Sequence, residues 1–153
     1  MSKSSHGATK QAPSSAAMQA WIALMRTQKR LLDLVENDLK RAGLPPLGWY
    51  DVLLELWRAD GGRLRPLDIE KRTLLAQYNL SRLLARLERE GLIGVEADPE
   101  DGRGKWAVIT SEGLAVREAM WAVYAGSIRE HVQSKLSEDE ATRLGTLLAR
   151  IST

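Results

Sequence analysis

The sequence predicts a mainly α-helical fold with one small β-hairpin, an α+β arrangement. Several segments repeat apolar residues every three or four positions, which is the period of a helix that is buried on one side. Near residue 100, two short β-prone segments flank a stretch of turn-forming residues, a pattern typical of a hairpin. The chain has 153 residues, of which 44% are apolar and 27% charged, so it can bury a core of its own.

Four helices are expected before the hairpin. The first covers residues 18–42, where Gly43 and two prolines end it. Pro46 suits the first turn of a second helix, which stops at the sequence DGG, and a short third helix begins near Pro66. The fourth helix covers residues 77–90 and shows one apolar stripe, made of Leu80, Leu83, Leu84 and Leu87.

The hairpin and two further helices complete the predicted order of elements. The strands are LIGVEA and KWAVIT, and the polar segment DPEDGRG joins them. Thr110 is placed to cap a long helix over residues 111–136. Ser137 and Glu140 match the capping box of a final helix.

The residue types present argue against catalysis and metal binding. The chain has no cysteine, which excludes disulfides, zinc ribbons, thiol nucleophiles and thiol-based oxidant sensing. Its two histidines, His6 and His131, lie far apart, and no HExxH, GxSxG or phosphate-loop pattern occurs. We therefore expect no enzyme activity, no cofactor and no bound metal.

Residues 1–17 are expected to form a flexible tail, because they are rich in Ser, Ala and Gly and carry almost no bulky apolar side chains. The tail is either a solubilising leader or a basic arm that contacts DNA phosphates. Its Lys3 and Lys10 account for the net charge of +2, so the rest of the chain is electrically balanced. We read no secretory signal and no membrane span, and expect a cytoplasmic protein.

Three helices followed by a β-hairpin are the arrangement of a winged helix-turn-helix, in which the second helix of the pair enters the major groove of DNA and the hairpin, or wing, lies beside it. The predicted DNA-binding region is residues 46–110. Residues 18–45 and 111–153 carry apolar helical stripes that this small core does not need, which favours flanking dimerisation helices.

The helix over residues 77–90 is the predicted major-groove element. Its side opposite the leucines has no acidic residue, while Glu88 and Glu90 lie to the side. Arginine can donate two hydrogen bonds to guanine or clamp a phosphate. An ordinary solvated helix with a few arginines is the alternative. The side in question carries Tyr78, Arg82, Ala85 and Arg89, with Ser81 and Arg86 on its flanks.

The hairpin tip is the second candidate contact. Arg103 stands between two glycines, and a thin, glycine-flanked arginine can enter a minor groove. Asp101 is placed to hold that guanidinium by a charge-assisted hydrogen bond. The alternative is a routine turn with a surface ion pair of little energetic weight.

The run LSRLLARLEREGLI, followed by DPEDGRGKWAVIT and SEG, resembles the MarR family of bacterial transcriptional regulators. The similarity extends from about Met18 to Ile151. It implies a homodimer that binds a pseudo-palindromic operator, usually as a repressor, and that a small anionic or phenolic effector often releases. The residues that match the family's DNA-reading positions are Gln77, Tyr78, Asn79, Ser81, Arg82 and Arg86 on the helix and Asp101 and Arg103 on the wing.

The tryptophans suggest where an effector would bind. The chain has five tryptophans and no phenylalanine, and most of them fall on expected helices as core or dimer-contact residues. The resemblance implies that Trp21 or Trp49 lines an aromatic effector pocket. A winged helix used for protein–protein contacts rather than DNA is the competing function.

Overall fold

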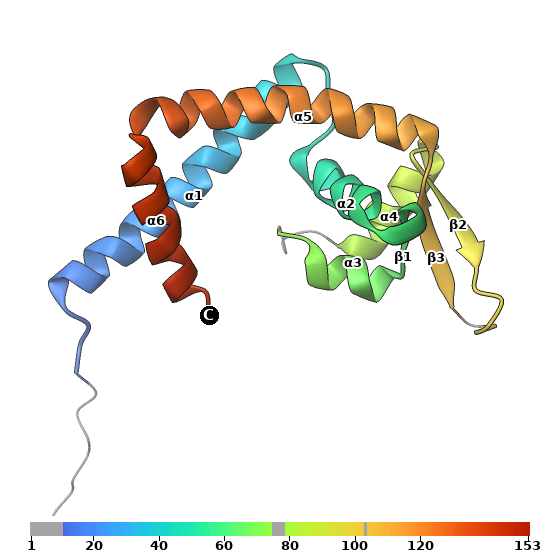
Figure 1. Cartoon of the computed structure of the whole chain (residues 1–153), viewed down its shortest axis with the longest axis horizontal. Coiled ribbons are helices and arrows are strands. Elements are labelled where there is room, and N and C mark those ends of the chain that lie inside the picture. Colours follow the sequence, from blue (N-terminus) through green and yellow to red (C-terminus); the bar gives the residue numbers. More distant parts are fainter. Residues whose placement is uncertain (1–10, 75–78, 103) are drawn as a thin grey trace, which may run out of the picture. The chain divides into compact units, whose positions relative to one another are not determined.

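The computed structural model describes residues 11–74, 79–102 and 104–153, which form six α-helices and one three-stranded sheet (Figure 1). None of its helices has an apolar stretch long enough to cross a bilayer. The helices are α1 Ser15–Arg41, α2 Leu47–Arg58, α3 Pro66–Arg72, α4 Leu80–Arg89, α5 Ser111–His131 and α6 Glu138–Ile151, and the strands are β1 Arg63–Leu64, β2 Ile93–Ala97 and β3 Lys105–Ile109.

The chain forms two compact units, residues 1–33 and 34–153. The boundary falls inside α1, so the first unit holds most of that helix and the second holds all the other elements. The two units are described separately. The predicted major-groove helix and the wing both lie in the second unit.

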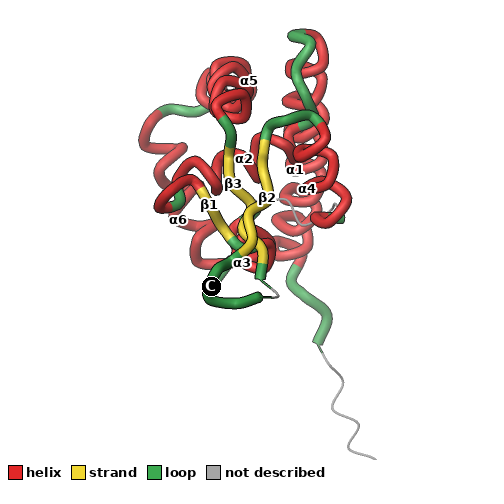
Figure 2. The backbone as a smooth tube through the Cα atoms, turned by 90° about the vertical axis from the view of Figure 1, so that its right-hand side faces the viewer, coloured by secondary structure: helices red, strands yellow, loops and turns green. Residues whose placement is uncertain are grey.

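The core of the second unit lies between the sheet and helices α2, α3 and α4. Antiparallel strands are ordered β1-β3-β2, with Leu64 opposite Ala107 and Ile93 opposite Ile109 (Figure 2). This places the winged helix-turn-helix elements around one apolar cluster, as the sequence predicts. Its buried members are Val52, Leu53, Leu56, Leu64, Ile69, Leu87, Leu92, Ile93 and Ala107.

The predicted helix ends are confirmed where a specific cap was named. Gly43 follows α1 with φ +70°, a conformation that glycine adopts without strain. The Oγ1 of Thr110 accepts a hydrogen bond from the backbone N–H of Gly113 at 3.1 Å at the start of α5. Ser137 and Glu140 form both hydrogen bonds of the capping box of α6.

Several predicted boundaries differ from the structure. Helix α1 begins at Ser15, so the last three residues of the segment predicted as a flexible tail, 15–17, are helical. Pro46 is the N-cap residue of α2 rather than part of its first turn. The long helix α5 ends at His131, and a separate 3₁₀ turn over residues 133–135 follows it. The two-residue strand β1 has no signal of its own in the sequence, because so short a strand is fixed by pairing with β3 rather than by propensity.

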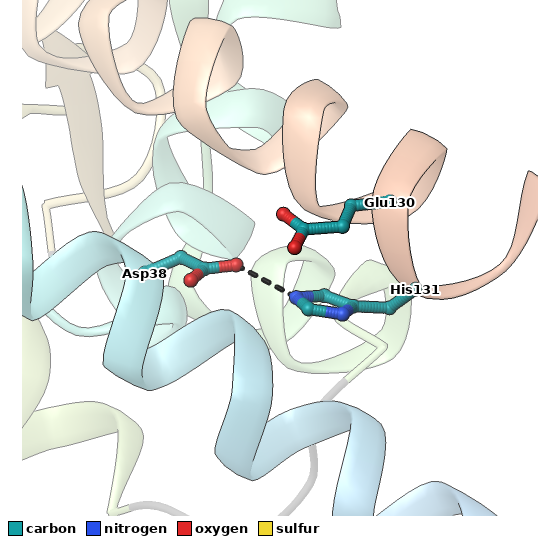
Figure 3. A group of neighbouring side chains, drawn as sticks. All are labelled: Asp38, Glu130 and His131. Carbon is teal, nitrogen blue, oxygen red and sulfur yellow. Dashed lines mark hydrogen bonds and ion pairs between the residues drawn. The ribbon is translucent and has the colours of Figure 1, made fainter. Parts of the chain in front are cut away.

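A partly buried hydrogen-bond network joins the end of α1 that belongs to the second unit to the end of α5. One Asp38 oxygen, Oδ2, accepts a hydrogen bond from Ser127 Oγ at 2.6 Å. The same oxygen lies 2.9 Å from His131 Nε2 (Figure 3). Arg41 pairs with the other oxygen. The pKa of Asp38 is lowered from its ordinary value of 3.8. The hydrogen bond from Ser127 is the largest cause of this shift, and the contact with His131 is the next.

We expect Ser127→Ala to destabilise the fold at neutral pH by about 1 kcal/mol, because a partly buried carboxylate loses a donor. Folding lowers the Asp38 pKa, so this stabilisation is present above the ordinary pKa and is lost as the pH falls through the lowered native value. The stability gap between wild type and variant should therefore narrow below about pH 4, as measured by urea unfolding at several pH values.

The matched control is Ser134→Ala, which removes an exposed serine hydroxyl that donates to the backbone carbonyl of Glu130. This control should show no such pH dependence. A Ser127→Ala gap that stays constant from neutral to acid pH would contradict the assignment.

Candidate nucleic-acid interface

The chain just after α3 is tied to the core by a buried carboxylate on α2. Asp51 is buried, and its Oδ1 accepts a hydrogen bond from the backbone N–H of Leu74 at 3.3 Å, just beyond the end of α3. In the sequence DVLLELW, Asp51 is one of two acidic residues among apolar ones, and nothing in this local pattern marks it for such a role. Asp51 thus helps fix where the chain leaves α3 on its way to α4.

The helix α4 begins at Leu80, with Asn79 as its N-cap, and not at residue 77 as predicted. The Asn79 Oδ1 accepts a hydrogen bond from the backbone N–H of Arg82 at 3.2 Å, which satisfies one of the free donors at the helix start. Gln77 and Tyr78 lie outside the described residues. Asn79 therefore has a structural role in addition to the DNA-contacting role expected from the resemblance.

Burial of the leucine stripe fixes which side of α4 faces solvent. Leu87 is fully buried, and the other three leucines pack against the same core cluster. The polar side is therefore turned outward, as the helical spacing predicts. The exposed residues along it are Ser81, Arg82, Ala85, Arg86, Glu88 and Arg89.

Four of these residues line an open depression along α4: Arg82, Ala85, Glu88 and Arg89. The helical spacing predicts that Glu88 lies to the side of this surface. The structure places Glu88 among the lining residues, so the surface is not free of acidic residues. The surface still carries two arginines against one acid. Small Ala85 leaves room between them for a close approach.

Arg86 is held on the flank of this surface. Its Nε donates to Glu90 Oε1 at 3.2 Å, and its guanidinium lies 5.9 Å from the centroid of the Trp49 ring. Trp49 is half-buried against the core cluster, so the structure places this tryptophan directly beside α4. Trp21, the other tryptophan expected at an effector site, belongs to the first compact unit and is 59% exposed.

The wing loop, residues 98–104, is closed by its own backbone hydrogen bonds. The N–H of Asp98 donates to the carbonyl of Gly104, and the N–H of Gly104 donates to the carbonyl of Asp101, each at 2.9 Å. Arg65 pairs with Asp98 and lies 3.8 Å from Asp101. The predicted Asp101–Arg103 contact cannot be followed, since Arg103 lies outside the described residues. Sequence reasoning missed Arg65 and Asp98, because it did not foresee the strand that brings Arg65 to the wing.

Several aromatic side chains and one arginine cluster between α2 and α5. Tyr50 stacks on Trp121 and meets Tyr124 edge to face, and burial raises the pKa of both tyrosines. The Arg117 guanidinium lies 4.0 Å from the ring centroid of Trp57, and its buried Nε has no hydrogen-bond partner. Such a group can stack on a planar ring and attract a negative charge.

Metal-binding atoms come close together in one place among the described residues, at Asp38, Glu130 and His131, whose ligand atoms lie within 4.8 Å of one another. The Asp38 carboxylate already interacts with Ser127, His131 and Arg41. These interactions account for the geometry as a structural network between two helices.

Comparison with known proteins gives consistent results. The model of the MarR family matches residues 42–104. The transcriptional regulator MhqR of Bacillus subtilis is 28% identical over 136 residues, which cover 88% of this chain and 90% of that protein. The transcriptional repressor YetL of the same organism is 24% identical over 139 residues, covering 89% and 83% of the two chains.

Among solved structures, a MarR family regulator from Streptomyces coelicolor, crystallised in complex with DNA, superposes with a TM-score of 0.81 at 26% identity. The match covers 93% of this chain and 89% of that one. These relatives are transcriptional regulators rather than enzymes.

Proposed function

We propose that the chain is a transcriptional regulator of the MarR family, and that it binds duplex DNA through α4 and the wing as a homodimeric repressor on a pseudo-palindromic operator. The observation that carries this proposal is the rotation of α4. Its leucines fill the core, and its three arginines and small alanine face solvent in the same compact unit as the wing.

The chemistry of the exposed residues suits a major groove. Arg82 and Arg86 can donate paired hydrogen bonds to guanine or to a phosphate, and Ser81 can donate to either. Beside them we assign base or phosphate contacts to Gln77, Tyr78 and Asn79. On the wing we assign a minor-groove contact to Arg103, and to Asp101 the positioning of that region.

A second copy of the chain is proposed to cover the terminal helices. Every residue of α6 is exposed in the single chain, including its apolar stripe. The first unit has an apolar stripe of its own on α1, with Trp21 and Met25 exposed. A two-fold dimer would bury such stripes and place two α4 helices one duplex turn apart, about 34 Å. The stripe on α6 consists of Leu144, Leu147, Leu148 and Ile151.

A small aromatic anion is the proposed effector class. The aromatic group with Arg117 between α2 and α5 offers ring faces and an unpaired guanidinium nitrogen, which are the contacts such a molecule needs. Trp49 and Trp21 remain candidates for the same role. Because Trp49 packs beside Arg86 on α4, a molecule that moved this ring would also disturb the DNA-facing helix.

We expect the chain to bind DNA from the region upstream of its own coding sequence, with an affinity that falls steeply as salt rises, because phosphate contacts release counterions. Arg82→Ala should weaken binding about tenfold, within the range of about 1–3 kcal/mol for a base-contacting arginine. A fluorescence-anisotropy titration at two salt concentrations measures both effects.

The matched control is Arg58→Ala on α2, where an exposed arginine forms only a loose surface ion pair with Glu55 at 4.0 Å. It removes the same charge away from α4 and should leave the affinity within about twofold of wild type. Equal losses in the two variants, or no DNA binding by the wild type, would contradict the proposal.

We expect a solution mass of twice the 17.0 kDa chain by light scattering. Leu147→Glu, which places a charge in the α6 stripe, should shift the mass toward the monomer, because the charge would be buried without a partner. Ala149→Glu, on the opposite side of the same helix, is the control and should stay dimeric. A monomeric wild type, or a dimer that tolerates Leu147→Glu, would count against this interface.

A further inference from the structure

On the outer face of the three-stranded sheet, two arginines pack against the ring of one tryptophan. Arg63 and Arg65 flank the buried Leu64, so both lie on the face that Leu64 does not occupy, and Trp106 lies beside them on β3. The guanidinium carbon of Arg63 lies 4.6 Å from the centroid of the Trp106 ring, and that of Arg65 lies 4.7 Å from it. The two arginines thus make matching contacts with the same aromatic ring.

Only one of these arginines forms an ion pair with the wing loop. Arg65 pairs with Asp98 and approaches Asp101, whereas Arg63 forms no ion pair within the described part of the chain. The Asp98 side chain is only 5% exposed. A buried carboxylate that loses its cation carries an uncompensated charge, so the loop conformation depends on Arg65.

The loop backbone closes around this pair. Asp98 Oδ1 accepts a hydrogen bond from the N–H of Glu100 at 2.9 Å, so one carboxylate binds both the loop backbone and Arg65. At Gly104, an added Cβ would lie 2.9 Å from a guanidinium nitrogen of Arg65. The guanidinium therefore pairs with the Asp98 side chain at one end of the loop and lies close to Gly104 at the other.

We propose that Arg65 is a positioning residue that presets the wing loop for DNA binding without contacting DNA itself. This inference rests on the proposed function. By holding Asp98, Glu100 and Gly104 in one arrangement before binding, Arg65 lowers the entropy that must be lost when the wing meets DNA. Arg65 is also the N-cap residue of α3, but its side chain makes no capping bond, so replacing it removes no helix cap.

The test compares Arg65→Leu with Arg63→Leu, which loses the same charge and an equivalent contact with Trp106. Hydrogen exchange of the DNA-free protein reports directly on whether Arg65 holds the wing loop. We expect the amides of Glu100 and Gly104 to exchange at least about tenfold faster in Arg65→Leu, to remain as in wild type in Arg63→Leu, and to be partly restored in Arg65→Lys. Unchanged exchange in Arg65→Leu would overturn the proposal.

Operator titrations then test the consequence for DNA binding. Arg65→Leu should weaken binding about tenfold, and Arg63→Leu by no more than about twofold. In an Arg103→Ala background, Arg65→Leu should add almost nothing, since both changes act through the wing. Fully multiplicative losses, or equal losses in the two leucine variants, would mean that Arg65 acts as a simple phosphate contact and would overturn the positioning role.

Two further observations separate the possible failures. If Arg65→Leu fails to fold, as shown by its melting curve, Asp98→Asn removes the same ion pair and is expected to keep the Glu100 hydrogen bond. It should show the same effects in weaker form, and wild-type exchange and affinity in this variant would contradict the proposal. If the wild type binds no DNA, the proposed function fails, while the exchange measurements still show whether Arg65 holds the loop.

Discussion

Burial of the α4 leucine stripe is the constraint on which the remaining interface depends. Leu87 is completely buried, and the neighbouring leucines pack on the same cluster as Val52, Leu53 and Ile69. Because a helix with one apolar stripe can bury only that side, its rotation about its own axis is set. The direction in which Arg82 and Ala85 face follows from that rotation and not from any contact of their own.

A few polar contacts place the elements around this core. Asp51 holds the turn after α3, and Arg65 holds the wing loop. Thr110 links the end of α4 to the start of α5, because its hydroxyl donates to the carbonyl of Gly91 after α4, at 2.7 Å, and also caps α5. Gly113 completes this junction, since a Cβ there would lie 2.2 Å from the carbonyl oxygen of Leu92. The start of α5 is therefore held beside Gly91 and Leu92, just before β2, and the end of α5 is held by Asp38.

This arrangement gives a physical route between the two ends of α5. The helix is 21 residues long, with the wing junction at its beginning and the Asp38–Ser127–His131 network at its end. The aromatic group with Arg117 lies on the same helix between those ends. A molecule bound there would contact α5, a helix that is already attached to the wing. Release of DNA by an effector would require this kind of coupling between two sites.

Much of this could be predicted from the sequence because it depends on local patterns. The spacing of Leu80, Leu83, Leu84 and Leu87 gave the exposed side of α4, and Thr110, Ser137 and Glu140 gave two helix starts. The contacts that sequence reasoning missed join residues far apart in the chain. Arg65 and Asp98 are 33 positions apart, and Asp51 and Leu74 are 23 apart, and no local period marks such pairs.

The most direct test of the central claim is amide chemical-shift mapping of the full chain with and without an operator duplex. We expect the largest chemical-shift changes on Ser81 to Arg89 and on the wing loop, and almost none on α6. Changes concentrated on the leucine side of α4 or on α6, with the wing loop unchanged, would contradict DNA binding through α4 and the wing.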